Sequence, residues 1–90
     1  MESSKEKIAI SLKKAHSLLG KIIKMHQEGA YCVDLMQQNL AVIGLLKSAH
    51  QMLMGNHLNT CFRTALGTKN EKRKEQMTQE ILQVTKLFNK

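Results

Sequence analysis

The stretch from Tyr31 to Leu66 constrains the fold most, because it contains no proline and consists largely of residues that favour helices. Leucine, methionine, alanine, glutamine and lysine fill most of its positions. We therefore predict one long central α-helix across this range. A shorter helix on each side of it would complete an all-α chain of three helices.

Three potential metal ligands lie on one face of this predicted helix. At 100° per residue, the rotation from Cys32 to His57 comes to about 340°, and the rotation to Cys61 is about 20° beyond whole turns. Along the axis, however, Cys32 and His57 would be roughly 37 Å apart, so they cannot meet within one chain. A second copy of the helix, packed antiparallel, would bring Cys32 of one chain beside His57 and Cys61 of the other. Two-fold symmetry would then make two equivalent sites.

The residues between these ends have the 3–4 spacing of a seam between packed helices, with the crossing point near Leu45 and Leu46. The predicted seam consists of Cys32, Met36, Asn39, Ile43, Leu46, His50, Leu53 and His57. Cysteine is also often buried as a small apolar residue, and His-x-x-x-Cys alone is a weak motif. The spacing by itself therefore leaves both a metal site and a packing role open.

Two further helices flank the central one. Ser3 and Glu6 have capping-box spacing, which predicts a first helix starting at Ser4 or Lys5 and ending near Gly29. Its apolar stripe is Ile8, Leu12, Ala15, Leu19, Ile22 and His26. After Gly67, either Thr68 or Asn70 would cap a last helix, whose apolar stripe is Met77, Ile81, Val84 and Phe88. We expect residues 1–90 to form a single helical domain that oligomerises, because so short a chain buries only a modest core.

The charge of the chain favours an anionic partner. The formal net charge is +7 on 90 residues, and nucleic acid is the commonest partner of so basic a domain. Only three aromatic residues are present, which argues against single-strand binders that stack bases on aromatic rings. The first helix carries the best basic stripe, formed by Lys7, Lys14 and Lys21 with Lys13 and Lys24 close by. We expect Lys13, Lys14 and Lys21 to contact DNA. A lysine stripe on an amphipathic helix is also typical of a face that is merely solvated.

Several classes of protein are disfavoured. The two cysteines do not make a disulfide framework and are expected to be reduced thiols in a cytoplasmic protein. The amino-terminal residues are polar, and no apolar run approaches membrane-spanning length, so no membrane association is expected. No Ser-His-Asp arrangement, paired carboxylates or glycine-rich phosphate loop is found, so we do not expect an enzyme.

One pattern resembles a known family. Tyr31-Cys32-x-Asp34, with Gln38 and Ala41 after it and His57-Leu58-x-x-Cys61 further on, is similar to the copper-sensing repressor (CsoR) family of bacterial transcription factors. The resemblance implies an antiparallel homodimer with a four-helix-bundle core, assembled into a tetramer as a dimer of dimers. It also implies that Cys32 of one subunit and His57 and Cys61 of the other bind Cu(I), for which two thiolates and an imidazole are suitable ligands. Metal-free protein would bind double-stranded operator DNA, and the copper form would release it.

The resemblance extends to supporting residues, but it weakens in the basic part of the first helix. In the family a tyrosine and a glutamate support the ligands without binding the metal; Tyr31 matches the first directly, and Glu80 is the better candidate for the second. The family's basic residue of the second helix falls at or next to Lys47, which we count as a fourth candidate DNA contact. The family carries R-(apolar)-x-R-(apolar)-x-G-Q where this chain has K-A-H-S-L-L-G-K, so His16 and Ser17 replace basic positions. Lysine cannot reproduce the forked hydrogen bonding of arginine. The alternative is a thiol or persulfide sensor, or a copper-binding helical protein, without operator binding.

Overall fold

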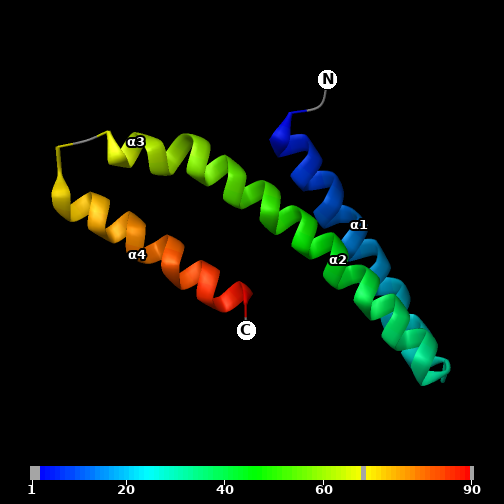
Figure 1. Ribbon diagram of the computed structural model, residues 1–90. Coiled ribbons are helices and arrows are strands. Elements are labelled where there is room, and N and C mark those ends of the chain that lie inside the picture. The colour runs from blue at the N-terminus through cyan, green and yellow to red at the C-terminus, as the bar shows by residue number, and fades with distance from the viewer. Residues whose placement is uncertain (1–2, 68, 90) are drawn as a thin grey trace. The chain divides into compact units, whose positions relative to one another are not determined.

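The chain is all-α, as predicted (Figure 1). The computed structural model describes residues 3–67 and 69–89, with the backbone alone at 61, 62, 65 and 66. The elements are α1 (Ser4–Gln27), α2 (Cys32–Asn56), the π-helical segment η1 (His57–Phe62), α3 (Arg63–Leu66) and α4 (Glu71–Phe88). The described residues fall into two compact units, one ending at Met54 and the other starting at Gly55.

Helix α1 begins and ends as its sequence predicts. The amide of Glu6 donates to the Ser3 hydroxyl over 3.2 Å, and the Ser3 amide donates to the Glu6 carboxylate over 3.4 Å, which completes a capping box. At the other end, Gly29 has a φ of 76°, the left-handed conformation that glycine adopts without a steric penalty. The Gly29 amide donates to the carbonyl of His26, and the Ala30 amide donates to that of Met25. This pair of hydrogen bonds is a Schellman motif.

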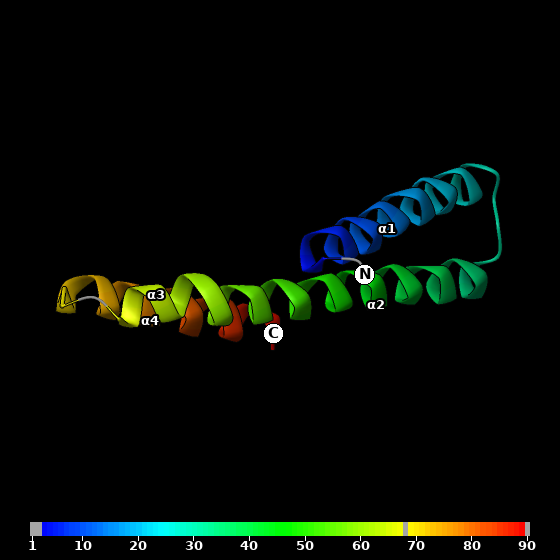
Figure 2. The ribbon, with the colours of Figure 1, turned by 90° about the horizontal axis from the view of Figure 1, so that it is seen from above.

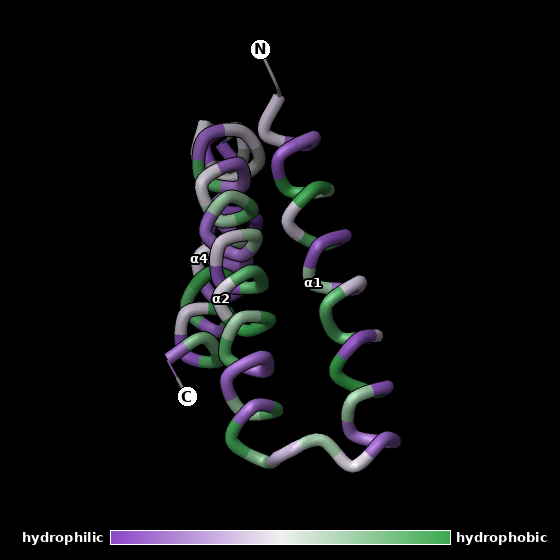
Figure 3. Tube along the Cα trace, turned by 90° about the vertical axis from the view of Figure 1, so that its right-hand side faces the viewer, coloured by the Kyte–Doolittle hydropathy of each residue, from purple (hydrophilic) through white to green (hydrophobic). Residues whose placement is uncertain are grey.

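Helices α1 and α2 form the first unit, in which α2 runs back antiparallel to α1 after the turn at 28–31 (Figures 1 and 2). Polar and apolar residues are interspersed along both helices (Figure 3), and α1 is the more amphipathic of the two. The buried positions are Ile8, Ser11 and Ala15 of α1 and Val42 and Ala49 of α2.

The buried face of α1 differs from the predicted apolar stripe. Ser11 is buried, whereas Leu12 and Leu19 are 43% and 45% exposed. Positions 8, 11 and 15 are spaced by three and four, so they define one narrow face of a helix. Leu12 and Leu19 lie on its flank, where a single neighbouring helix does not cover them. The chain by itself therefore buries only part of the apolar surface of α1.

The central helix runs without a break from Cys32 to Leu66, but it is not α-helical throughout. Residues His57–Phe62 take π-helical hydrogen bonding between α2 and the short α3. The extent of this helix was predicted from the sequence, whereas the π turn was not. Asn56, Asn59 and Thr60 have low α-helical propensity, which makes a local departure from α geometry inexpensive here.

Helix α4 is capped by Asn70, one of the two predicted candidates. Its side-chain oxygen accepts a hydrogen bond from the Arg73 amide over 3.2 Å; Thr68, the other candidate, lies outside the described residues. Met77 is buried, whereas Val84 is 38% and Phe88 41% exposed. The predicted stripe of α4 is therefore only partly buried in the single chain. No helix in the described ranges is both long and apolar enough to cross a membrane.

Candidate metal site and basic surface

Cys32, the first predicted metal ligand, is the first residue of α2. Its thiol is free and exposed. The residue before it, Tyr31, is 69% exposed, and its carbonyl accepts a hydrogen bond from the Leu35 amide over 3.2 Å, closing the first turn of the helix. Cys32 thus lies in the hydrogen-bonded first turn of α2 and is exposed, so an external ligand or a second chain can reach it.

The other two predicted ligands, His57 and Cys61, lie beyond the far end of α2. His57 is the first residue of η1 and is half-buried, and the backbone of Cys61 lies in the same π-helical segment. Helix α2 alone has 25 residues, which corresponds to a length of about 37 Å. Cys32 and His57 therefore belong to opposite ends of one helix.

Within the part of the chain whose side chains are described, no three histidine, cysteine, aspartate or glutamate residues come together as a metal site. The side chain of Cys61 lies outside that part, so the complete ligand set is not tested by the single chain. The set of Cys32, His57 and Cys61 stays a prediction. Its donors are two soft sulfurs and one imidazole, which is the chemistry that Cu(I) prefers.

Three of the four predicted DNA-binding lysines share one surface of α1. Lys13, Lys14 and Lys21 line a shallow depression together with Ser17 and Leu18. The fourth, Lys47, is an exposed residue of α2 and does not line this depression. From the sequence alone, Ser17 was interpreted only as a lost basic position. Its spacing of three and four residues from these lysines could have identified it as part of the same surface.

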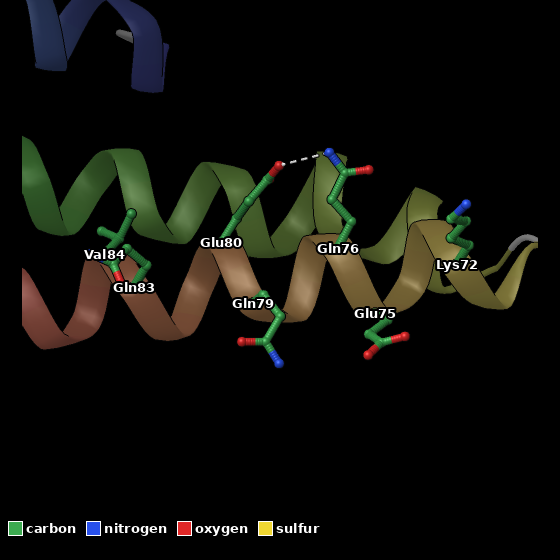
Figure 4. Close-up of a pocket in the computed structure, with 7 residues that line it drawn as sticks. All are labelled: Lys72, Glu75, Gln76, Gln79, Glu80, Gln83 and Val84. Atoms are coloured by element: carbon green, nitrogen blue, oxygen red, sulfur yellow. Dashed lines mark hydrogen bonds between the residues drawn. The ribbon is translucent and has the colours of Figure 1, made fainter.

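Glu80, one of the two predicted supporting residues, lies in the middle of α4. Its carboxylate is exposed and accepts a hydrogen bond from the side-chain amide of Gln76 over 3.5 Å (Figure 4). This distance is at the long limit for a hydrogen bond, so Gln76 restrains the carboxylate weakly. Glu80 lines an open depression whose other residues are Lys72, Glu75, Gln76, Gln79, Gln83 and Val84. A supporting role for Glu80 or Tyr31 at a metal stays a prediction.

Comparison with known proteins agrees with the family resemblance found in the sequence. The family model described as a metal-sensitive transcriptional repressor matches residues 4–90. The copper-sensing transcriptional repressor CsoR of Mycobacterium tuberculosis (strain ATCC 25618 / H37Rv) is 40% identical over 65 residues. The protein of the same name from Mycobacterium ulcerans (strain Agy99) is 42% identical over 65 residues.

These alignments cover 71% of the chain, but only 55% and 56% of the two mycobacterial proteins. The chain thus spans about half the length of the curated relatives that it matches. The family description is that of a repressor, in agreement with the prediction that the chain is not an enzyme.

Proposed function

The chain belongs to the family of metal-sensitive transcriptional repressors, and on that premise we propose that it is a Cu(I)-responsive repressor. In this proposal the metal-free protein binds double-stranded operator DNA and releases it when copper binds. The observation that carries the proposal is the placement of a free, exposed Cys32 and of His57 and Cys61 at opposite ends of one unbroken helix. A second copy of the helix, packed antiparallel, would bring such ligands together.

The proposed assembly is an antiparallel homodimer in which two central helices pair along the predicted seam. Exposed apolar side chains support it, because Met36, Ile43, Leu46 and Leu53 are between 40% and 57% exposed in the single chain. These residues recur at spacings of seven, three and seven, which fits the heptad pattern of a helix–helix interface. Further association of dimers into a tetramer would cover the exposed Leu12 and Leu19 of α1.

The proposed copper site takes Cys32 from one subunit and His57 and Cys61 from the other. Cu(I) accepts three soft ligands, whereas a structural Zn²⁺ site would require a fourth. Tyr31 lies next to the first ligand in the sequence, and we include it, with Glu80, as a residue that supports the ligands by hydrogen bonding. Such outer partners fix the orientation of the ligands and tune metal affinity.

The proposed DNA-binding surface is the lysine-lined depression of α1, with Lys47 as a further phosphate contact. Lysines that neutralise phosphates release counterions, so DNA binding should fall steeply as salt is added. The carboxyl end of α1 is joined to Cys32 only by the short turn at 28–31. A metal that binds Cys32 therefore acts on a residue that is covalently close to the DNA-binding helix.

One titration tests this function and separates it from the alternative of a thiol sensor. Cu(I) is added in competition with a chelator of known affinity, with and without a fluorescent DNA duplex that contains the operator. Copper-driven release of the duplex, together with weaker Cu(I) binding when DNA is present, supports the repressor, because such coupling must be reciprocal. Tight Cu(I) binding without any DNA affinity would instead support a copper-binding or thiol-sensing helical protein.

A further inference from the structure

The six residues His57–Phe62 form a π-helical turn within an otherwise α-helical run. π-Helical hydrogen bonding is rare, occurs mostly as single turns inside α-helices, and is frequent at functional sites. In this chain the turn contains two of the three proposed copper ligands, His57 and Cys61. The departure from α geometry therefore coincides with the part of the helix for which we propose a chemical role.

Two threonine hydroxyls bind backbone carbonyls at this turn. The Thr60 hydroxyl donates to the carbonyl of Asn56, the residue before the turn, over 2.6 Å. The Thr64 hydroxyl donates to the carbonyl of Thr60 over 2.7 Å, and that carbonyl also accepts from the Arg63 amide. A change from i→i+4 to i→i+5 hydrogen bonding alters which amide reaches each carbonyl. The two threonine hydroxyls supply additional hydrogen-bond donors to backbone carbonyls at the place where the backbone hydrogen-bonding pattern changes.

The same side-chain bond occurs in α4, where the helix is regular. The hydroxyls of Thr78 and Thr85 donate to the carbonyls of Lys74 and Ile81, each over 2.9 Å. In a regular α-helix such a carbonyl already accepts an amide hydrogen bond, so the hydroxyl is a second donor, as the Thr64 hydroxyl is at the Thr60 carbonyl. The bonds of Thr60 and Thr64 are shorter and lie at the π turn. Thr78 therefore provides a matched control for their effect.

We propose that Thr60 and Thr64 are positioning residues whose hydroxyls hold the π turn that sets the register of His57 and Cys61. Residues four apart are offset by about 40° in an α-helix. A turn closed by i→i+5 bonds contains more residues, so it changes the angle at which positions 57 and 61 project from the axis. A turn that is held in this register before copper binds reduces the reorganisation that binding requires. This inference rests on the proposed function, because metal binding by His57 and Cys61 is itself proposed.

Replacing the hydroxyls one at a time tests the inference. Thr60→Val and Thr64→Val remove the donor and keep the β-branched shape, whereas Thr60→Ser keeps the donor. Cu(I) affinity is measured by chelator competition, copper–thiolate absorption by ultraviolet spectroscopy, and amide hydrogen exchange at residues 57–64 in the metal-free protein. We expect Thr60→Val to weaken Cu(I) binding by about tenfold or more, as loss of a ligand-orienting partner does. Thr60→Val should also shift the copper–thiolate absorption band and speed amide exchange at residues 57–64. Thr60→Ser, which keeps the hydroxyl, should give the values of the unmodified protein in all three measurements.

A threonine of the regular helix α4 serves as the control. Thr78→Val removes an equivalent hydroxyl from a regular helix, so it should leave copper affinity and the absorption band unchanged. Wild-type copper affinity in Thr60→Val and Thr64→Val would overturn the inference, even if amide exchange became faster. Copper binding weakened equally by Thr78→Val would overturn it as well, since the effect would then be general. If the unmodified protein bound no Cu(I), the proposed function itself would fail, an outcome distinct from the others.

Discussion

The amide of Ala30 donates to the carbonyl of Met25 over 2.9 Å, across a glycine at position 29 whose φ is 76°. An L-residue in this left-handed conformation pays about 1 to 2 kcal/mol. A Cβ at Gly29 would meet nothing within 4 Å, so any cost of Gly29→Ala comes from the backbone and not from a clash. This bond therefore depends on glycine at the turn between the basic helix and Cys32.

The first prediction compares this glycine with Gly20, which lies inside α1. Gly29→Ala should lower the free energy of unfolding by about 1 kcal/mol, whereas Gly20→Ala should raise it by about 0.5 to 1 kcal/mol, because alanine is the better helix former. A Cβ at Gly20 also meets nothing within 4 Å. The two substitutions therefore differ in the backbone conformation of the glycine and not in steric contacts. Urea unfolding measures both values. Equal effects of the two substitutions would contradict the role assigned to the turn.

The second prediction concerns assembly. Leu46 is 46% exposed in the single chain and lies near the proposed two-fold axis. Leu46→Lys should therefore shift the protein from dimer or tetramer towards monomer in sedimentation at micromolar concentration, because burying an unpaired charge in the seam is costly. Leu82→Lys, at a 57% exposed position of α4, is the control and should leave the proposed central-helix pairing intact. An unmodified protein that sediments as a monomer would rule out the shared copper site.

The third prediction concerns the ligands. Cys32→Ala and Cys61→Ala should each abolish high-affinity Cu(I) binding, because thiolates are the strongest of the proposed donors for Cu(I). His57→Ala should weaken binding by at least the roughly 10- to 100-fold that loss of an outer partner costs, and it should uncouple copper from DNA. Chelator competition measures these affinities.

The control substitutions for the ligands are His16→Ala and His26→Ala. Both histidines are exposed residues of α1 and lie outside the proposed ligand set. Copper affinity should be unchanged in either variant. A marked loss of affinity in one of them would mean that the ligand set contains a histidine of α1 instead of, or in addition to, His57.

Sequence patterns predicted the helices well because each boundary depends on a local interaction. The Ser3–Glu6 capping box and the left-handed Gly29 are formed by residues within a few positions of one another, so their side chains identify them. The buried face of α1 was predicted less well, since burial of Ser11 in place of Leu12 depends on which neighbouring helix covers that face.

The π turn at His57–Phe62 was not predicted, because hydrophobic periodicity is too coarse to register one extra residue in a helical turn. The presence of two threonines four residues apart, at positions 60 and 64, is a signal that could have drawn attention to it. Residue types and spacing left a metal site and a packing role open, and the proposed ligand set came from the resemblance to the family. In the proposed site its three-dimensional arrangement depends on a second chain, and no pattern within one sequence specifies the geometry of that contact.

The last prediction concerns the basic surface of α1. The lysines Lys13, Lys14 and Lys21 line one depression, so together they can contact adjacent phosphates of a duplex. Changing all three to glutamate should remove measurable DNA binding by the metal-free protein. Neutral replacements by glutamine should leave weaker binding whose logarithmic salt slope is reduced by up to about 2.7, at about 0.9 per phosphate contact. Cu(I) affinity measured without DNA should stay near its original value, because the proposed ligands lie on other elements.

A matched charge reversal separates a specific surface from the effect of net charge. Changing the exposed Lys69, Lys72 and Lys86 to glutamate alters the net charge by the same amount but leaves the α1 depression intact. This variant should keep most of the DNA affinity. Its small loss of affinity should disappear at higher salt, because salt screens the long-range electrostatic attraction to DNA. Fluorescence anisotropy of a labelled duplex at several salt concentrations measures both variants. Equal losses would show that the lysines of α1 act only through overall charge, and an unchanged affinity in the α1 variant would place the DNA contact elsewhere on the chain.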